Sequence, residues 1–187
     1  YNFRGDLIKL IISNGYEVIV TGPNRDNVEK IEALGARFVE IPMDKNGVDP
    51  VKDIRYEKAL YKLFCEEKPD AVLGYTSKPV IYGSIAAKRA SVKKITAMIT
   101  GLGYAFTSQT KKAKIIRTIM SVLYKRAMSS ADTVIFQNPD DMEQFTSLGL
   151  VKKEKCKLVA GSACPLCMTA KHTPSIFRNR AVRFRFL

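Results

Sequence analysis

The fold is decided by the stretch AVLGYTSKPVIYGSIAAKRASVKKITAMI, residues 71–99. It begins with an apolar run over 71–75, continues with a pattern typical of a helix over 79–90, and ends with a second apolar run over 94–99. A strand, a helix and a second strand in this order form a crossover unit, in which the two strands lie parallel in one sheet.

The same alternation continues on both sides of this stretch, through the first 160 residues. Continuous apolar runs such as VIV and VIF indicate strands that are covered on both faces. The sequence therefore predicts a doubly wound, mostly parallel, Rossmann-like α/β sheet. The remaining strands are expected over 17–21, 37–41, 133–137 and 157–160, and the remaining helices over 6–13, 26–34, 50–67, 110–130 and 139–148.

The first strand of such a sheet is missing from the beginning of the sequence. A doubly wound sheet is normally entered through a central strand, which a turn connects to the first helix. Residues 1–6, YNFRGD, already have the character of that turn. We therefore expect the chain to be a fragment of a longer protein.

We predict that residues 1–162 form one domain. Residues 163–187 differ from it in composition and in hydrophobic periodicity. This tail contains no acidic residue and no clean periodicity, although RFRF at 183–186 alternates as a strand would. We expect it to be frameshifted or disordered. Cys164, Cys167 and His172 resemble half of a zinc site, but Cys156 is the only nearby fourth ligand, so no metal site is predicted. Cys65 is expected on the apolar side of its helix, in the core of the protein.

Positive charge is concentrated in one part of the chain. The formal net charge is +13, and residues 71–131 contain eleven lysines and arginines but no acid. Such an excess favours an anionic partner: nucleic acid, an anionic membrane or a phosphorylated small molecule.

The sequence lacks the motifs that are typical of several enzyme classes. His172 is the single histidine, and the sequence contains no G-x-S-x-G elbow, no Walker motif and no G-x-G-x-x-G after a strand. A triad hydrolase, an NTPase and a dinucleotide-binding enzyme are therefore disfavoured. No run of eighteen apolar residues that could cross a membrane occurs, and the residues from Tyr1 do not follow the pattern of a signal peptide.

Three loops suited to anions are expected at one rim of the sheet. Arg4-Gly5-Asp6 precedes the first helix, whose amino end favours an anion. Thr76-Ser77-Lys78-Pro79 and Thr100-Gly101-Leu102-Gly103-Tyr104 each follow a strand, at the carboxyl edge where open α/β sheets bind ligands.

The segment 111–130 predicts a basic amphipathic helix. On a helical wheel, Ile115, Ile116, Ile119, Met120, Val122 and Leu123 fall on one side, while the basic residues fall opposite or on its flank. One interpretation is a core-facing helix with a solvated basic back. The absence of acids to pair with these bases instead favours contact with anionic lipid. The basic residues are Lys111, Lys112, Lys114, Arg117, Lys125 and Arg126.

Four motifs occur within the first 106 residues: NFRGDLI at 2–8, GYEV at 15–18, KPVIYGSIAAK at 78–88 and GLGYAF at 101–106. Together they resemble the amino-terminal domain of family four glycosyltransferases of the GT-B fold. Within that family the sequence is most similar to bacterial enzymes that extend polyprenyl-diphosphate-linked sugars for cell-surface polysaccharides or glycans.

The resemblance implies a retaining transfer from a nucleotide sugar, without a required metal or other cofactor, to a lipid-diphosphate-linked acceptor. It also implies a cytoplasmic protein that is peripheral on the inner face of the membrane, with the basic helix as its contact. No catalytic residue can be assigned. The positions that match the acceptor side of the family's cleft are Asn2, Arg4, Gly5, Ser77, Lys78, Gly101, Gly103 and Tyr104.

The family's second domain, which binds most of the nucleotide sugar, is not in this sequence. We therefore expect the isolated chain to be inactive. Two alternatives stay open: a non-enzymatic basic module that binds nucleic acid, and an α/β nucleotide-binding oxidoreductase or epimerase. The helix at 111–130 has only Tyr124 to stack on bases, which disfavours the first.

Overall fold

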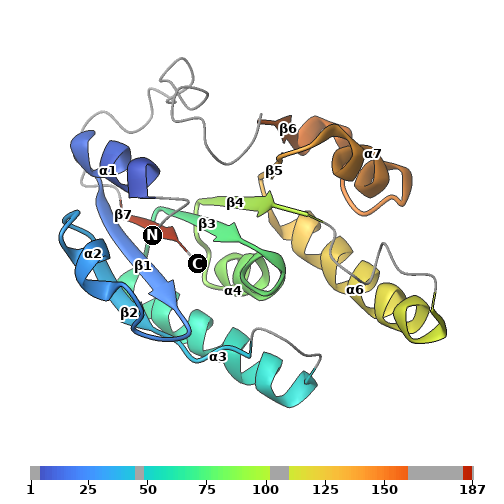
Figure 1. Cartoon of the computed structure of the whole chain (residues 1–187), viewed down its shortest axis with the longest axis horizontal. Coiled ribbons are helices and arrows are strands. Elements are labelled where there is room, and N and C mark those ends of the chain that lie inside the picture. The colour runs from blue at the N-terminus through green and yellow to red at the C-terminus, as the bar shows by residue number, and fades with distance from the viewer. Residues whose placement is uncertain (1–4, 45–48, 102–109, 160–182, 187) are drawn as a thin grey trace.

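A computed structural model describes residues 5–44, 49–101, 110–159 and 183–186, the last four and residues 111–113 by their backbone alone. Seven parallel strands form one sheet in the order β2-β1-β7-β3-β4-β5-β6 (Figure 1). The strands are β1 (Glu17–Gly22), β2 (Arg37–Glu40), β3 (Ala71–Tyr75), β4 (Lys94–Ile99), β5 (Thr133–Phe136), β6 (Cys156–Leu158) and β7 (Arg183–Phe186).

Helices connect the strands and cover both faces of the sheet. In Figure 1, α1 lies over one face, and α3, α4 and α6 lie over the other. The helices are α1 (Gly5–Ser13), α2 (Val28–Glu32), α3 (Pro50–Glu67), α4 (Ser84–Arg89), α6 (Lys111–Ser130) and α7 (Pro139–Ser147), with a π turn η1 (Pro79–Gly83) and a 3-10 turn η2 (Lys153–Lys155).

The core has two parts, one on each face of the sheet. Val72 of β3 belongs to the larger cluster, which includes Leu60 of α3. The next residue, Leu73, belongs to the smaller cluster with Ile8 of α1 and Met98 of β4. Successive residues of a strand point to opposite faces, so this division is what a sheet buried on both sides requires. The predicted doubly wound α/β fold is confirmed.

Strand β7 fills the place of the strand that we expected to be missing. It lies between β1 and β3, with Phe184 in register with Val18 on one side and Ala71 on the other. In the doubly wound order 3-2-1-4-5-6, this is the position of the first strand. The alternating RFRF segment is therefore a central strand. The predicted domain boundary at residue 162 lies outside the described residues and stays a prediction.

One local expectation was wrong. Cys65 is exposed and not part of the core, because it lies outside the buried face of α3. The helical segment expected over 79–90 is present, and its first turn is the π turn η1, which leads directly into α4. The observed bounds of the other predicted elements differ from the expected ones by at most two residues at either end.

Candidate functional site

The turn after β3 is tightly packed at the sheet's carboxyl edge. A side chain at Gly74 would bring its Cβ to 3.0 Å from the carbonyl oxygen of Pro79, so the strand packs directly against η1. Thr76 has a φ of 72°, which costs a β-branched residue free energy. The Val80 N–H donates to the Thr76 carbonyl at 3.0 Å and closes the turn. Strain and π turns gather at functional sites, which marks this turn as a candidate.

Lys78, which we expected in an anion site, forms a buried ion pair. Its Nζ lies 2.6 Å from Oδ1 of Asp53 in α3, and the two side chains are 14% and 6% exposed. Such a pair holds only when its remaining hydrogen-bonding groups are satisfied. The charge of Lys78 is therefore partly neutralised by Asp53, and the pair fixes the turn against α3.

Tyr82 completes this arrangement. Its hydroxyl donates to Oδ2 of Asp53 at 3.0 Å, so both carboxylate oxygens of Asp53 are bonded. Burial, and then the hydrogen bond to Asp53, raise the pKa of Tyr82 far above its usual value. The Tyr82 ring meets the Tyr56 ring edge to face, with 6.3 Å between centroids. Lys78, Asp53 and Tyr82 form a polar network beneath the turn, and the Tyr56 ring packs against it.

Sequence analysis missed Asp53, although a signal was present. The buried residues of α3 are Asp53, Tyr56, Leu60, Leu63 and Phe64, which share one helical face. An acidic residue in phase with that apolar face indicates a buried carboxylate that needs a partner, and this much could have been recognised from the spacing.

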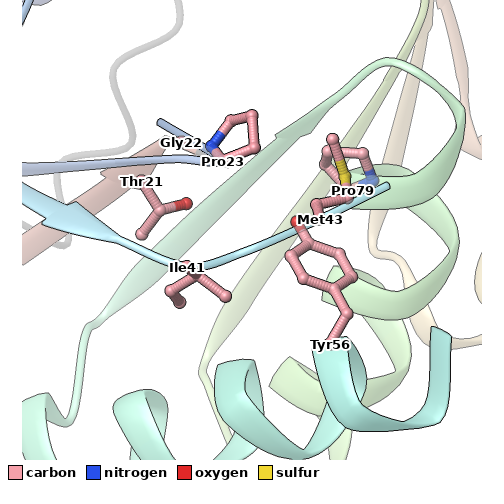
Figure 2. A pocket seen from close by; sticks show the side chains of 7 residues that line it. All are labelled: Thr21, Gly22, Pro23, Ile41, Met43, Tyr56 and Pro79. Carbon is pink, nitrogen blue, oxygen red and sulfur yellow. The ribbon is translucent and has the colours of Figure 1, made fainter. Parts of the chain in front are cut away.

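A small pocket opens beside this network, at the carboxyl ends of β1 and β2 (Figure 2). Its volume is about 40 Å³. Residues from the ends of two strands, from α3 and from η1 meet here, which no single motif could predict. The lining residues are Thr21, Gly22, Pro23, Ile41, Met43, Tyr56 and Pro79.

Ser77 connects the turn to α6. Its side chain is hydrogen-bonded to Tyr124, a fully buried residue of α6. Burial raises the pKa of Tyr124, and this hydrogen bond opposes that rise in part. The Tyr124 ring also packs edge to face on Phe145 of α7. The turn after β3 is thus attached to α3 on one side and to α6 on the other.

The outer surface of α6 is both apolar and basic. Ile115, Ile119 and Val122 are 65%, 45% and 66% exposed, whereas Tyr124, Ala127 and Met128 are buried. The apolar side expected from the wheel is therefore divided between core and solvent. Lys114, Lys125 and Arg126 are exposed, and none of them forms an ion pair with another described residue. The exposed residues from 114 to 126 are called the α6 surface below.

Four of the predicted acceptor positions belong to the described residues, and they lie at the carboxyl edge of the sheet. Gly5 is the first residue of α1, Ser77 and Lys78 follow β3, and Gly101 follows β4, beside β3 in the sheet. Asn2, Arg4, Gly103 and Tyr104 lie outside the described residues, as do the side chains of Lys111 and Lys112.

Two features are absent from the part of the chain that the structure describes. No group of three or more His, Cys, Asp or Glu side chains there could hold a metal ion. No helix in the same ranges is long and apolar enough to cross a membrane.

Comparison with known proteins gives two findings. Residues 4–138 match the family model described as "Glycosyl transferase 4-like". The chain is also similar to N,N'-diacetylbacillosaminyl-diphospho-undecaprenol alpha-1,3-N-acetylgalactosaminyltransferase of Campylobacter jejuni subsp. jejuni serotype O:2, at 27% identity over 156 residues. This alignment covers 83% of the chain and 42% of the relative, so the chain spans less than half of that protein's length. The family model spans most of the chain and the predicted fold is present; the chain therefore belongs to the glycosyl transferase 4-like family.

Proposed function

We propose that this chain is the acceptor-side domain of a glycosyltransferase that moves a sugar from a nucleotide sugar to a polyprenyl-diphosphate-linked acceptor. The observation that carries the proposal is the similarity, over 83% of the chain, to a relative whose name specifies a diphospho-undecaprenol-linked acceptor. The family match over residues 4–138 supports the same reaction class. The family match favours neither of the two alternatives, a basic module that binds nucleic acid and a nucleotide-binding oxidoreductase or epimerase.

The acceptor's diphosphate binds at the carboxyl edge in this proposal. The backbone N–H groups at Gly5, where α1 begins, and the loops after β3 and β4 supply donors and positive charge. Because Asp53 already pairs with Lys78, Lys78 contributes mainly by holding the turn in place. The proposed acceptor positions are Asn2, Arg4, Gly5, Ser77, Lys78, Gly101, Gly103 and Tyr104.

A further domain binds the nucleotide sugar, and the transfer requires neither a metal nor another cofactor. The relative is more than twice as long as the aligned segment, which leaves room for such a domain. The 187-residue chain alone is accordingly inactive in transfer.

The α6 surface rests on the cytoplasmic face of the cell membrane. Exposed Ile115, Ile119 and Val122 enter the interface between head groups and acyl chains, while the basic side chains meet anionic lipid. Each lysine or arginine near such a surface contributes about 1 kcal/mol. The proposed contacts are Lys111, Lys112, Lys114, Arg117, Lys125 and Arg126. This placement would present a lipid-linked diphosphate to the turn after β3, to which α6 is bonded through Tyr124.

A transfer assay tests this function. The protein that joins this chain to its nucleotide-sugar domain is incubated with labelled nucleotide sugars and with undecaprenyl-diphosphate-linked saccharides in detergent or vesicles. We expect label in the lipid extract, and none when the 187-residue chain replaces the longer protein. Transfer only to soluble saccharides, or transfer by the 187-residue chain alone, would contradict the proposal.

A further inference from the structure

The pocket beside η1 is small and largely apolar. Pro23, Ile41, Met43 and Pro79 line it together with Thr21, Gly22 and Tyr56 (Figure 2). Its volume of about 40 Å³ would hold roughly three waters, since one water needs about 10–15 Å³ of such volume. A sugar ring is too large for it, but a substituent of one or two heavy atoms fits.

The Tyr56 hydroxyl points into this pocket. Figure 2 shows the Tyr56 ring rising from α3 with its oxygen toward Met43 and Pro79. Tyr56 is 5% exposed, and its hydroxyl makes no hydrogen bond with any residue in the described ranges. Burial raises the pKa of Tyr56, so this hydroxyl stays protonated at neutral pH and is available as a donor. The Tyr56 hydroxyl oxygen is not among the fully buried, unpartnered polar atoms of the described residues, so it is accessible from the pocket and can donate to a ligand there.

The position of the Tyr56 hydroxyl is fixed before any ligand binds. Its ring packs against Tyr82, which donates to Asp53, and Asp53 is paired with Lys78. The pocket also borders the proposed acceptor site, since Pro79 lines it and Lys78 directly precedes Pro79. A group that enters the pocket would therefore belong to a ligand that lies along the turn after β3.

The lining restricts the chemistry of that group. No charged side chain lines the pocket, so a carboxylate or an ammonium would be buried without a counter-ion. A lone hydroxyl group would give up its hydrogen bonds to water and find no partner on the apolar side of the pocket. A methyl group with a neighbouring carbonyl oxygen suits both the apolar lining and the hydroxyl donor. The methyl group fills the apolar space, and the oxygen accepts a hydrogen bond from the hydroxyl.

We propose that this pocket binds the acetamido group of an N-acetylated sugar, with its methyl in the pocket and its carbonyl oxygen accepting a hydrogen bond from the Tyr56 hydroxyl. The inference rests on the proposed function, in which a saccharide lies at this edge of the sheet. It makes Tyr56 a residue that determines specificity for the acceptor sugar.

Met43 provides a direct test because it lines the pocket. The 187-residue chain is labelled with ¹³C at its methionine methyl groups, and the Met43 signal is assigned through the variant Met43→Leu. The chain is then titrated with methyl 2-acetamido-2-deoxyglucoside or with methyl glucoside, which carries a hydroxyl in place of the acetamido group. We expect a saturable shift of the Met43 signal with the acetamido sugar, at roughly tenfold lower concentration than with the glucoside.

Two variants on the same helix distinguish a specific hydrogen bond from general packing. Tyr56→Phe keeps the ring but removes the donor, and we expect it to weaken binding of the acetamido sugar about three- to tenfold. Tyr61→Phe removes a hydroxyl of α3 that does not line the pocket, and we expect no change. A silent Met43 signal, equal responses to both sugars, or equal effects of the two variants would overturn the inference.

The result is separable from that of the transfer assay. Transfer to a lipid-linked acceptor together with a silent Met43 signal would remove the pocket assignment and leave the proposed function. A selective Met43 response without any lipid-linked transfer would do the reverse.

Discussion

At the scale of single residues, the account depends on a few buried polar side chains under the turn after β3. Asp53 is 4% exposed, and both of its carboxylate oxygens are bonded, to Lys78 and to Tyr82. The sequence places Lys78 at the sheet edge, but it cannot show that a residue 25 positions earlier neutralises it. That pairing depends on how α3 packs against η1.

We expect Asp53→Ala to destabilise the domain by about 3 kcal/mol, because it leaves the Lys78 ammonium buried without its counter-ion. Urea unfolding followed by circular dichroism measures this loss. The matched control is Glu57→Gln, which breaks the pair of Glu57 with Arg89, whose side chain is half exposed. The control is expected to cost less than about 1 kcal/mol. Equal losses in the two variants would show that the Asp53 pair has no special role.

The buried tyrosines predict a pH dependence at the alkaline end. Burial raises the pKa of Tyr82 above the ordinary value of 10.0. Above about pH 10 the unfolded chain releases this proton while the folded chain retains it, so the free energy of unfolding falls as pH rises. Tyr82→Phe is expected to flatten this fall between about pH 9.5 and 11. An unchanged slope in the variant would contradict the buried, protonated hydroxyl.

At the scale of elements, α6 shows where sequence interpretation succeeds and where it stops. Its length and amphipathic character were predictable from periodicity. A wheel alone could not divide Ile115, Ile119 and Val122 from the buried residues Tyr124 and Met128, because the division depends on where α4 and η1 meet the helix. The pocket could not be predicted from the sequence either, because its lining residues come from segments that lie far apart along the chain.

We expect Ile119→Asp to weaken binding of the chain to anionic vesicles at least about fivefold, since it places a charge in the proposed lipid interface. Flotation with phosphatidylglycerol vesicles measures the change. Leu148→Asp serves as the control, because Leu148 is 49% exposed, close to the 45% of Ile119, but lies after α7. The membrane assignment of α6 would be wrong if the two variants lost binding equally.

At the scale of the whole molecule, the alternation of apolar runs and helical patterns was sufficient to predict the parallel sheet. The central position of β7 was not predictable, because β7 begins 84 residues after the end of β4 and yet pairs with β1 and β3, which lie earlier still in the chain.

We expect removal of residues 183–187 to lower the free energy of unfolding by several kcal/mol, because β1 and β3 would each lose one of their two neighbouring strands. Urea unfolding of the shortened chain measures this. Removal of Leu187 alone, beyond the end of β7, is the matched control and is expected to change little. Equal stability of the two shortened chains would show that β7 does not hold the sheet together.

The central claim is that this domain receives a lipid-linked diphosphate at a membrane, and vesicle binding by the 187-residue chain tests it most directly. Two vesicle preparations are matched in surface charge, one with undecaprenyl diphosphate and one with phosphatidylglycerol only, and a single-stranded oligonucleotide serves as a third ligand at physiological salt. The account predicts tightest binding to the vesicles that contain undecaprenyl diphosphate and weak binding to the oligonucleotide. Equal binding to the two vesicle preparations, or preference for the oligonucleotide, would contradict it.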